Sequence, residues 1–299
     1  GVQSNAPKIE SVNEGDRSVT LGWRAAPGAD RYEVYISTKS QSYTSPAAVT
    51  FSTSYKVTGL SNGTTYYFVV SAINEAGEIF SDEVSAVPRT VPSPPGNVRA
   101  TAYNKSAVVY FDLPSDNGGR PITKYIVTSY PGFITAEGTS SPITVNGLQN
   151  GTRYAFTVKA VNEAGSSYES GRSNYVIPSS VPSPPGNVRA TAYNKSAVVY
   201  FDLPSDNGGS PIIKYIVTSY PGNITAEGIR SPITVNGLQN GTSYTFTVKA
   251  VNETGISNES EQSNSVIPKT VPSPPGNVRA TALSNRVVVR FNEPTDNGG

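Results

Sequence analysis

Apolar and polar residues alternate along most of this chain, and turn-forming residues interrupt the alternation about every ten positions. In the stretch 106–113, for example, Ala107, Val109 and Phe111 share one face, because successive side chains of a strand point to opposite sides. No segment carries the apolar period of about 3.6 residues that is typical of an amphipathic helix. The pattern therefore predicts an all-β protein with almost no helix.

The stretch 91–180 shows the pattern of one folding unit. Asn104-Lys105 predicts a tight turn, and the glycines of 116–119 predict a loop, because glycine accepts positive φ at no steric cost. The predicted strands are 97–103, 106–113, 122–130, 133–138, 142–148, 151–162 and 168–177. Seven such strands are enough for two sheets packed face to face, so we expect a β-sandwich.

This unit is repeated along the chain. The decapeptide VPSPPGNVRA begins at Val91, Val181 and Val271, and the segments 91–180 and 181–270 differ at only about fifteen positions. A long and faithful period indicates a tandem array of one folded unit. We expect domains at 1–90, 91–180 and 181–270, with strands A and B of a partial fourth domain at 271–299.

Composition excludes several classes of function. The formal net charge is +1 without a basic block, which argues against a nucleic-acid partner. No apolar run approaches the ~18 residues of a membrane-spanning helix, so we expect no membrane insertion. The absence of Cys and His excludes disulfides, histidine-based catalytic triads and ordinary zinc sites. We therefore expect no enzyme, no cofactor and no metal.

The sequence resembles the fibronectin type III domain, an immunoglobulin-like sandwich of seven strands. A run of the form Leu-x-x-x-Thr-x-Tyr-x-Phe-x-Val-x-Ala-x-Asn-x-x-Gly is typical of that family, and it begins here at Leu60, Leu148 and Leu238. The resemblance covers nearly the whole chain. It implies three such sandwiches in series.

The resemblance also assigns roles to core residues. Trp23 matches the family's tryptophan of strand B, and Phe111 and Phe201 stand at that position in the later units. The tyrosine of the repeated run would form a tyrosine corner, in which its hydroxyl bonds to backbone across the E–F turn. The tyrosines at this position are Tyr66, Tyr154 and Tyr244.

The units are joined by the repeated segment Val-Pro-Ser-Pro-Pro-Gly. Prolines fix φ and favour an extended chain, so the joint is short and semi-rigid. The AB turn, the EF turn, most of the BC loop and the joint are identical between copies. Repeated joints of one geometry predict an elongated rod or a gentle superhelix.

Two carboxylates lie close together in the predicted loop between strands B and C, at Asp112 and Asp116. Clustered oxygens could hold calcium, because hard cations prefer oxygen ligands. The alternative, which the turn pattern favours, is a polar loop with an aspartate that serves the backbone.

The differences between the two nearly identical units gather in loops and in the last strand. Phe133, Tyr168 and Tyr175 give the second unit aromatic side chains that the third unit lacks. Exposed aromatics can anchor a protein or glycan partner through these loops. Neutral drift on exposed positions explains the same differences, and we favour drift.

We expect a structural array in an extracellular or surface-displayed protein, which forms a semi-rigid rod and links flanking domains of a longer chain. One alternative is an adhesive or glycan-binding accessory region of a secreted polysaccharide-degrading enzyme. Another is a structural protein of a phage tail or fibre, and thus a virion location. The two strands at 271–299 would be completed by further residues of a longer chain or, alternatively, by a neighbouring chain.

Overall fold

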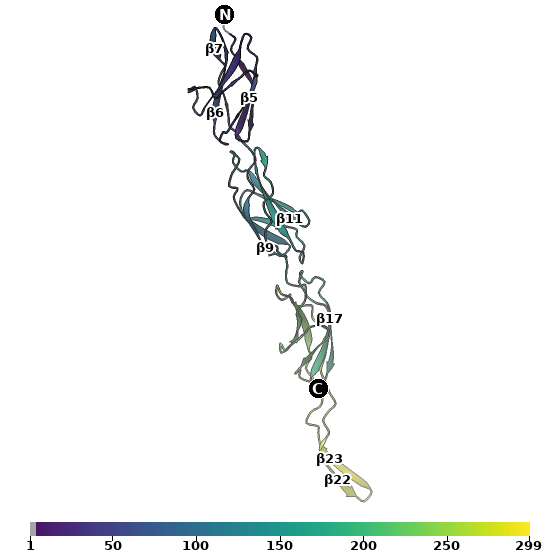
Figure 1. Cartoon of the computed structure of the whole chain (residues 1–299). Helices are drawn as coiled ribbons and strands as arrows, with labels where there is room; N and C mark the ends of the chain where they lie inside the picture. The colour runs from purple at the N-terminus through teal and green to yellow at the C-terminus, as the bar shows by residue number, and fades with distance from the viewer. Residues whose placement is uncertain (1–3) are drawn as a thin grey trace. The chain divides into compact units, whose positions relative to one another are not determined.

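The computed structural model describes residues 4–299, and all the helix or strand structure in this range is strand. No helix in this range has the length and apolarity needed to cross a bilayer. The strands group into three β-sandwiches, at residues 8–86, 96–176 and 186–266, followed in the chain by a hairpin (Figure 1). The all-β prediction is confirmed, whereas the domain boundaries at 90, 180 and 270 stay a prediction.

The first sandwich pairs a sheet of strands A, B and E with a sheet of strands C′, C, F and G. The first sheet has the order β1 (Lys8–Gly15), β2 (Ser18–Arg24), β5 (Ser54–Thr58). The second has the order β4 (Ala48–Thr50), β3 (Arg31–Ser37), β6 (Tyr66–Asn74), β7 (Gly77–Phe80), and β8 (Val84–Ala86) also pairs with β6. All these pairings are antiparallel.

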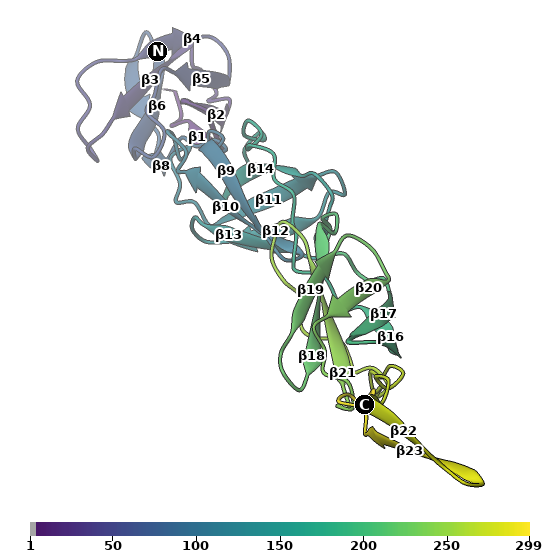
Figure 2. The same cartoon turned by 90° about the horizontal axis from the view of Figure 1, so that it is seen from below.

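The second and third sandwiches repeat this topology (Figure 2). The sheets of the second are β9 (Gly96–Tyr103), β10 (Ser106–Asp112), β13 (Ile143–Asn146) and β11 (Lys124–Tyr130), β12 (Thr135–Gly138), β14 (Ala155–Asn162), β15 (Gly165–Ser166). Those of the third are β16 (Gly186–Tyr193), β17 (Ser196–Asp202), β20 (Ile233–Asn236) and β18 (Lys214–Tyr220), β19 (Thr225–Gly228), β21 (Thr245–Val251). The final hairpin is β22 (Gly276–Leu283) with β23 (Arg286–Asn292).

The chain divides into two compact units by its internal contacts. The first consists of residues 4–101, 107–146 and 154–176. The second consists of residues 102–106, 147–153 and 177–299.

Aromatic residues of strand B lie in the core of each sandwich. Trp23, Phe111 and Phe201 are each 5% exposed. Phe111 packs against Tyr125 with ring centroids 4.8 Å apart, and Trp23 contacts Tyr32 of strand C edge-on at 5.5 Å. The indole Nε1 of Trp23 is buried without a hydrogen-bond partner among the described atoms. Phenylalanine keeps an aromatic ring in this place and buries no donor, which explains why the core accepts the exchange.

The tyrosines predicted to form corners lie beside the E–F turns. The hydroxyl of Tyr66 accepts a hydrogen bond from Ser61 N at 3.0 Å, and that of Tyr244 accepts one from Gln239 N at 3.1 Å. Tyr154 occupies the same position in the second sandwich and is 5% exposed. The bonded hydroxyl ties the turn to the start of strand F, which is the geometry of a tyrosine corner.

The predicted last strand at 168–177 is wrong for most of its length. Among the described residues between β14 and β16, strand structure is limited to β15 at Gly165–Ser166 and an isolated bridge at Val176. Between them, three buried serines bind β14 twice each. The serine N–H donates to a backbone carbonyl at 2.8–3.0 Å, and the N–H of the same β14 residue donates to the serine Oγ at 2.9–3.0 Å. The pairs are Ser167 with Ala160, Ser170 with Val158, and Ser173 with Phe156.

The spacing of these serines gives the physical reason. An extended chain of the polyproline type has three residues per turn, so every third side chain faces the same way. In a regular strand the side chains alternate with a period of two, and backbone carbonyls would accept the bonds from the N–H groups of β14 instead. The sequence Ser-x-x-Ser-x-x-Ser occurs at 167–173 and again at 257–263, where the same bonds form. Serine hydroxyls thus take the place of the carbonyls of a seventh strand.

The β22–β23 hairpin carries an apolar face that is open in this chain. Val287, Val289 and Phe291 are 61%, 53% and 58% exposed. The matching residues of the third sandwich include Val199, which is 0% exposed, and Phe201, which is 5% exposed. The difference arises because strands C, E and F cover this face in a complete sandwich.

Within the first unit, the joint after the first sandwich is fixed by contacts between backbone atoms. Thr90 N donates to Gly118 O at 2.9 Å, and Ser93 N donates to Asp116 O at 2.9 Å. The side-chain amide of Asn162 donates to both Thr90 O and Asn117 O at 2.8 Å. The proline-containing joint is therefore held to the loop between strands B and C.

Within the second unit, the same contacts recur at both later joints. Ser180 N donates to Gly208 O at 2.8 Å, and Thr270 N donates to Gly298 O at 2.7 Å. Asn252 donates to Ser180 O at 2.8 Å, as Asn162 does in the first unit. The same backbone contact thus forms at each joint, with threonine or serine as its donor.

Glycines make these contacts sterically feasible. A Cβ atom at Gly118 would lie 2.1 Å from Thr90 O, and one at Gly119 would lie 2.3 Å from Gly63 N. Gly118 and Gly119 also have φ of 72° and 82°, which side-chain-bearing residues rarely adopt. The Asn-Gly-Gly sequence of this loop is therefore required by the joint itself.

We predict that Ser170→Ala destabilises the second sandwich by about 1–3 kcal/mol, because the buried N–H of Val158 loses its acceptor. Hydrogen exchange at Val158 measures the effect. Ser140→Ala removes an exposed serine of the same sandwich and should leave the exchange unchanged. Equal protection in both variants would contradict the role of the serine ladder.

We predict that Tyr244→Phe lowers the free energy of unfolding of the third sandwich by about 1 kcal/mol, through loss of the bond to Gln239. Hydrogen exchange of strand F in that sandwich reports the change. Tyr193→Phe, at a tyrosine that is 54% exposed, serves as the control. Equal hydrogen exchange of strand F in Tyr244→Phe and Tyr193→Phe would contradict a stabilising role of the tyrosine corner.

Candidate functional site

The carboxylates that suggested a calcium site are engaged in local structure. Asp112 Oδ2 accepts a hydrogen bond from Asn97 Nδ2 at 2.6 Å, and Asp116 Oδ1 accepts one from Gly118 N at 2.8 Å. In residues 4–299 no group of three or more Asp, Glu, His or Cys side chains is placed to hold a metal ion. Asp116 therefore serves the backbone of the loop, as the turn pattern indicated, whereas Asp112 binds a side-chain amide of the neighbouring strand.

The three aromatics proposed as partner contacts are all exposed. Phe133 is 70% exposed and packs edge-on against Tyr130, with ring centroids 5.2 Å apart. Tyr168 is 86% exposed and lines a hollow beside the joint at 90–94. Tyr175 is 54% exposed. Their role as partner contacts stays a prediction.

Phe133 has an unusual backbone conformation. Its φ is 51°, in the left-handed region where a bulky side chain is rare. The third sandwich has Asn223 at this position with φ of 50°, and asparagine tolerates this region well. Arg172 lies over the Tyr130 ring, 4.7 Å from its centroid, on the same surface.

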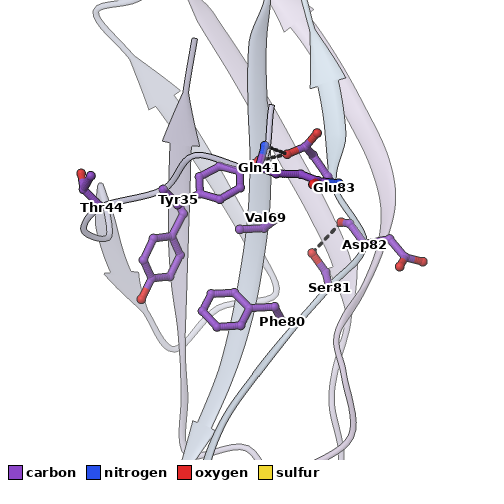
Figure 3. A pocket seen from close by; sticks show the side chains of 9 residues that line it. Tyr35, Gln41, Thr44, Val69, Phe80, Ser81, Asp82 and Glu83 are labelled. Atoms are coloured by element: carbon purple, nitrogen blue, oxygen red, sulfur yellow. Dashed lines mark hydrogen bonds between the residues drawn. The ribbon is translucent and has the colours of Figure 1, made fainter. Parts of the chain in front are cut away.

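Another concave site lies on the outer face of the second sheet of the first sandwich. It is a groove of about 620 Å³ whose lining includes two tyrosines and a phenylalanine (Figure 3). Tyr35 comes from β3, Val69 from β6 and Phe80 from the end of β7. The remaining lining residues are Gln41, Tyr43 and Thr44 from the loop after β3, and Ser81, Asp82 and Glu83 after β7.

The loop at 38–47 forms one wall of this groove, and the carboxylate of Glu83 binds three groups of the loop. Glu83 accepts hydrogen bonds from Ser40 Oγ at 2.6 Å and from Tyr43 Oη at 2.5 Å. It also accepts one from Gln41 N at 2.7 Å (Figure 3). The bond from Ser40, followed by those from Tyr43 and Gln41, lowers the pKa of the Glu83 carboxyl. The loop is thus fixed in place by an ionised side chain.

The aromatic side chains contact one another across the groove. The ring centroids of Tyr35 and Phe80 are 5.4 Å apart, and those of Tyr35 and Tyr43 are 6.4 Å apart. Burial raises the pKa of the Tyr35 hydroxyl, and the hydrogen bonds to Glu78 and Glu33 raise it further. Burial and the bond to Glu83 likewise raise the pKa of Tyr43. Both hydroxyls keep their protons at neutral pH and donate to carboxylates.

Sequence reasoning did not predict this groove. In the second sandwich only residues 131–134 separate β11 from β12, whereas 38–47 separate β3 from β4 in the first. The longer connection is a sequence signal, since it adds Tyr43 near a strand that already carries Tyr35. Its composition of Ser, Thr, Lys and Gln, however, reads as an ordinary polar loop.

Several curated proteins are similar in sequence to this chain. A kelch domain-containing protein of Saccharolobus solfataricus is 31% identical over 225 residues, which are 74% of this chain. M-protein of Gallus gallus striated muscle is 31% identical over 263 residues and 71% of the chain, and chitinase A1 of Niallia circulans is 35% identical over 199 residues and 62% of the chain. The matches cover only 28%, 18% and 27% of these relatives.

A solved structure of the chicken CNTN1 FN1–FN3 domains aligns with 89% of this chain and with 99% of its own chain. The sequence identity is 16% and the TM-score is 0.29. A TM-score this low does not by itself establish a common arrangement.

The family assignment comes from a comparison with family models. The model of the fibronectin type III domain matches residues 5–87, 93–175 and 183–266, and each match falls on one of the three sandwiches described above. Domains of this type are generally non-catalytic and mediate protein interactions within longer chains. The chain belongs to the fibronectin type III family and is a tandem array of its domains.

Proposed function

We propose that this chain is a semi-rigid, non-catalytic spacer in an extracellular or surface-displayed protein, where it links other modules and presents them at a distance. The observation that carries the proposal is the repetition of the joint contacts. The bonds Thr90–Gly118, Ser180–Gly208 and Thr270–Gly298 have the same atoms and lengths of 2.7–2.9 Å. A flexible tether would need no such contacts, because it would gain nothing from a fixed geometry.

Composition supports the extracellular part of the proposal. The chain has no Cys and is rich in Gly and Pro, with 27 and 24 residues respectively. A protein without thiols is indifferent to the redox state of its compartment. A virion surface would suit the same composition, and particle-associated purification of the whole protein would favour that location.

An accessory region of a secreted polysaccharide-degrading enzyme is the second candidate function. The observation in its favour is the 35% identity with chitinase A1 of Niallia circulans. In that case a catalytic or carbohydrate-binding neighbour would flank the array in the parent protein. Retention of the 299-residue chain on insoluble chitin would favour this candidate over the spacer.

We predict that small-angle X-ray scattering of the chain gives a radius of gyration of about 30 Å or more, since strands of ~10 residues make each unit ~35 Å long. A compact globule of this length would give only ~19 Å. A value near the compact limit would contradict the spacer.

A further inference from the structure

The groove of the first sandwich combines three features that the spacer proposal does not need. It is concave, its walls are aromatic, and acidic groups surround it. Its volume of about 620 Å³ is in the range of sites that accommodate small molecules or peptide side chains. Phe80 is 47% exposed in this groove, so a large apolar ring is left in contact with water.

The hydroxyls of both tyrosines donate to carboxylates. Tyr35 Oη lies 3.1 Å from Glu33 Oε2 and 3.0 Å from Glu78 Oε1, and Tyr43 Oη donates to Glu83. A phenol that donates to a carboxylate gains electron density in its ring. Such a ring attracts a cation over its face more strongly, because the attraction is electrostatic.

The charges that line the groove favour the same kind of ligand, while Glu33 behind Tyr35 is already paired with Arg31, whose Nε lies 3.6 Å from Glu33 Oε1. Asp82 and Glu83 line the groove, and none of the nine residues that line it is Lys or Arg. The three groups that donate to Glu83 are two hydroxyls and one amide, so these bonds do not neutralise its charge. The groove is therefore complementary to a positively charged side chain and disfavours an acidic one.

The site is also pre-organised. Glu83 holds the loop at 38–47 against the sheet, and Gln41 has φ of 54° within that loop. A wall that is already ordered does not lose conformational entropy when a ligand binds. The second and third sandwiches lack this loop, which makes them internal controls.

We propose that the groove binds a Lys or Arg side chain of a peptide segment, with the aliphatic stem on Phe80 and the cation over the tyrosine rings. The carboxylates around the groove attract the charge, and the rings supply cation–π contacts. This inference is independent of the spacer proposal, because it concerns one face of one sandwich.

The test uses the 299-residue chain labelled with ¹⁵N and capped hexa-arginine as the probe. We expect the peptide to shift the amide signals of Tyr35, Val69, Phe80 and the loop at 41–44. Phe80→Leu keeps an apolar side chain but removes the ring, and should weaken binding about threefold. Glu78→Gln removes a carboxylate that Tyr35 contacts, and should also weaken it.

Matched controls are available elsewhere in the chain. Tyr193→Leu removes a ring of the third sandwich that is 54% exposed, and Glu261→Gln removes an exposed carboxylate of the same sandwich. Neither variant should weaken the binding of hexa-arginine in the groove. Glu261→Gln lowers the general attraction of the chain for the peptide only by the loss of one distant charge. The binding of hexa-arginine should also weaken as salt is added, because salt screens the attraction between charges at an exposed site.

Three outcomes would overturn the proposal. One is a set of shifts spread over the acidic residues of all three sandwiches instead of the groove. Another is equal weakening by the groove variants and the controls. The third is binding of neutral chitohexaose in the groove without binding of hexa-arginine, which would assign the site to a glycan.

Discussion

Each joint of this array depends on a backbone approach that leaves no room for a side chain. A Cβ atom would lie 2.1 Å from a carbonyl oxygen at Gly118, 2.0 Å at Gly208 and 2.0 Å at Gly298. Such a contact has a defined length and direction, because two backbone groups are bonded and no flexible side chain intervenes. The geometry of a joint is thereby a property of the repeated sequence, and the spacer proposal follows from this constraint.

One joint carries an additional feature. In the first unit, Arg89 pairs with Glu14 and with Glu163 at 3.0 Å each, and Arg120 Nε lies 3.4 Å from Glu163. The third sandwich has Ser210 at the position of Arg120, so this difference between the repeats has a structural meaning. Partly exposed ion pairs contribute little singly, and a network of them is sensitive to salt. The backbone contacts are common to all joints, whereas the ionic network is specific to this one.

Much of the fold could be predicted from the sequence. Successive side chains of a strand point to opposite faces, so a strand with one face in the core has apolar residues at every second position. Ala107, Val109 and Phe111 alternate in the sequence and are all buried. The serine ladder could not be predicted in this way, since Ser170 is polar and recurs with a period of three. The groove was missed for a different reason: Glu83 and the loop at 38–47 are far apart in sequence and meet only when β3, β6 and β7 assemble into one sheet.

Distance measurements between spin labels across the first joint test the central claim most directly. The chain has no cysteine, so Lys56→Cys and Thr144→Cys place labels on exposed positions of the first and second sandwiches without background. We expect one narrow distance distribution, which broadens in Gly119→Ala because a Cβ there would lie 2.3 Å from Gly63 N. Gly96→Ala, where no heavy atom lies within 4 Å of the added Cβ, should leave it narrow. A distribution that is equally broad in all three proteins would contradict a fixed joint.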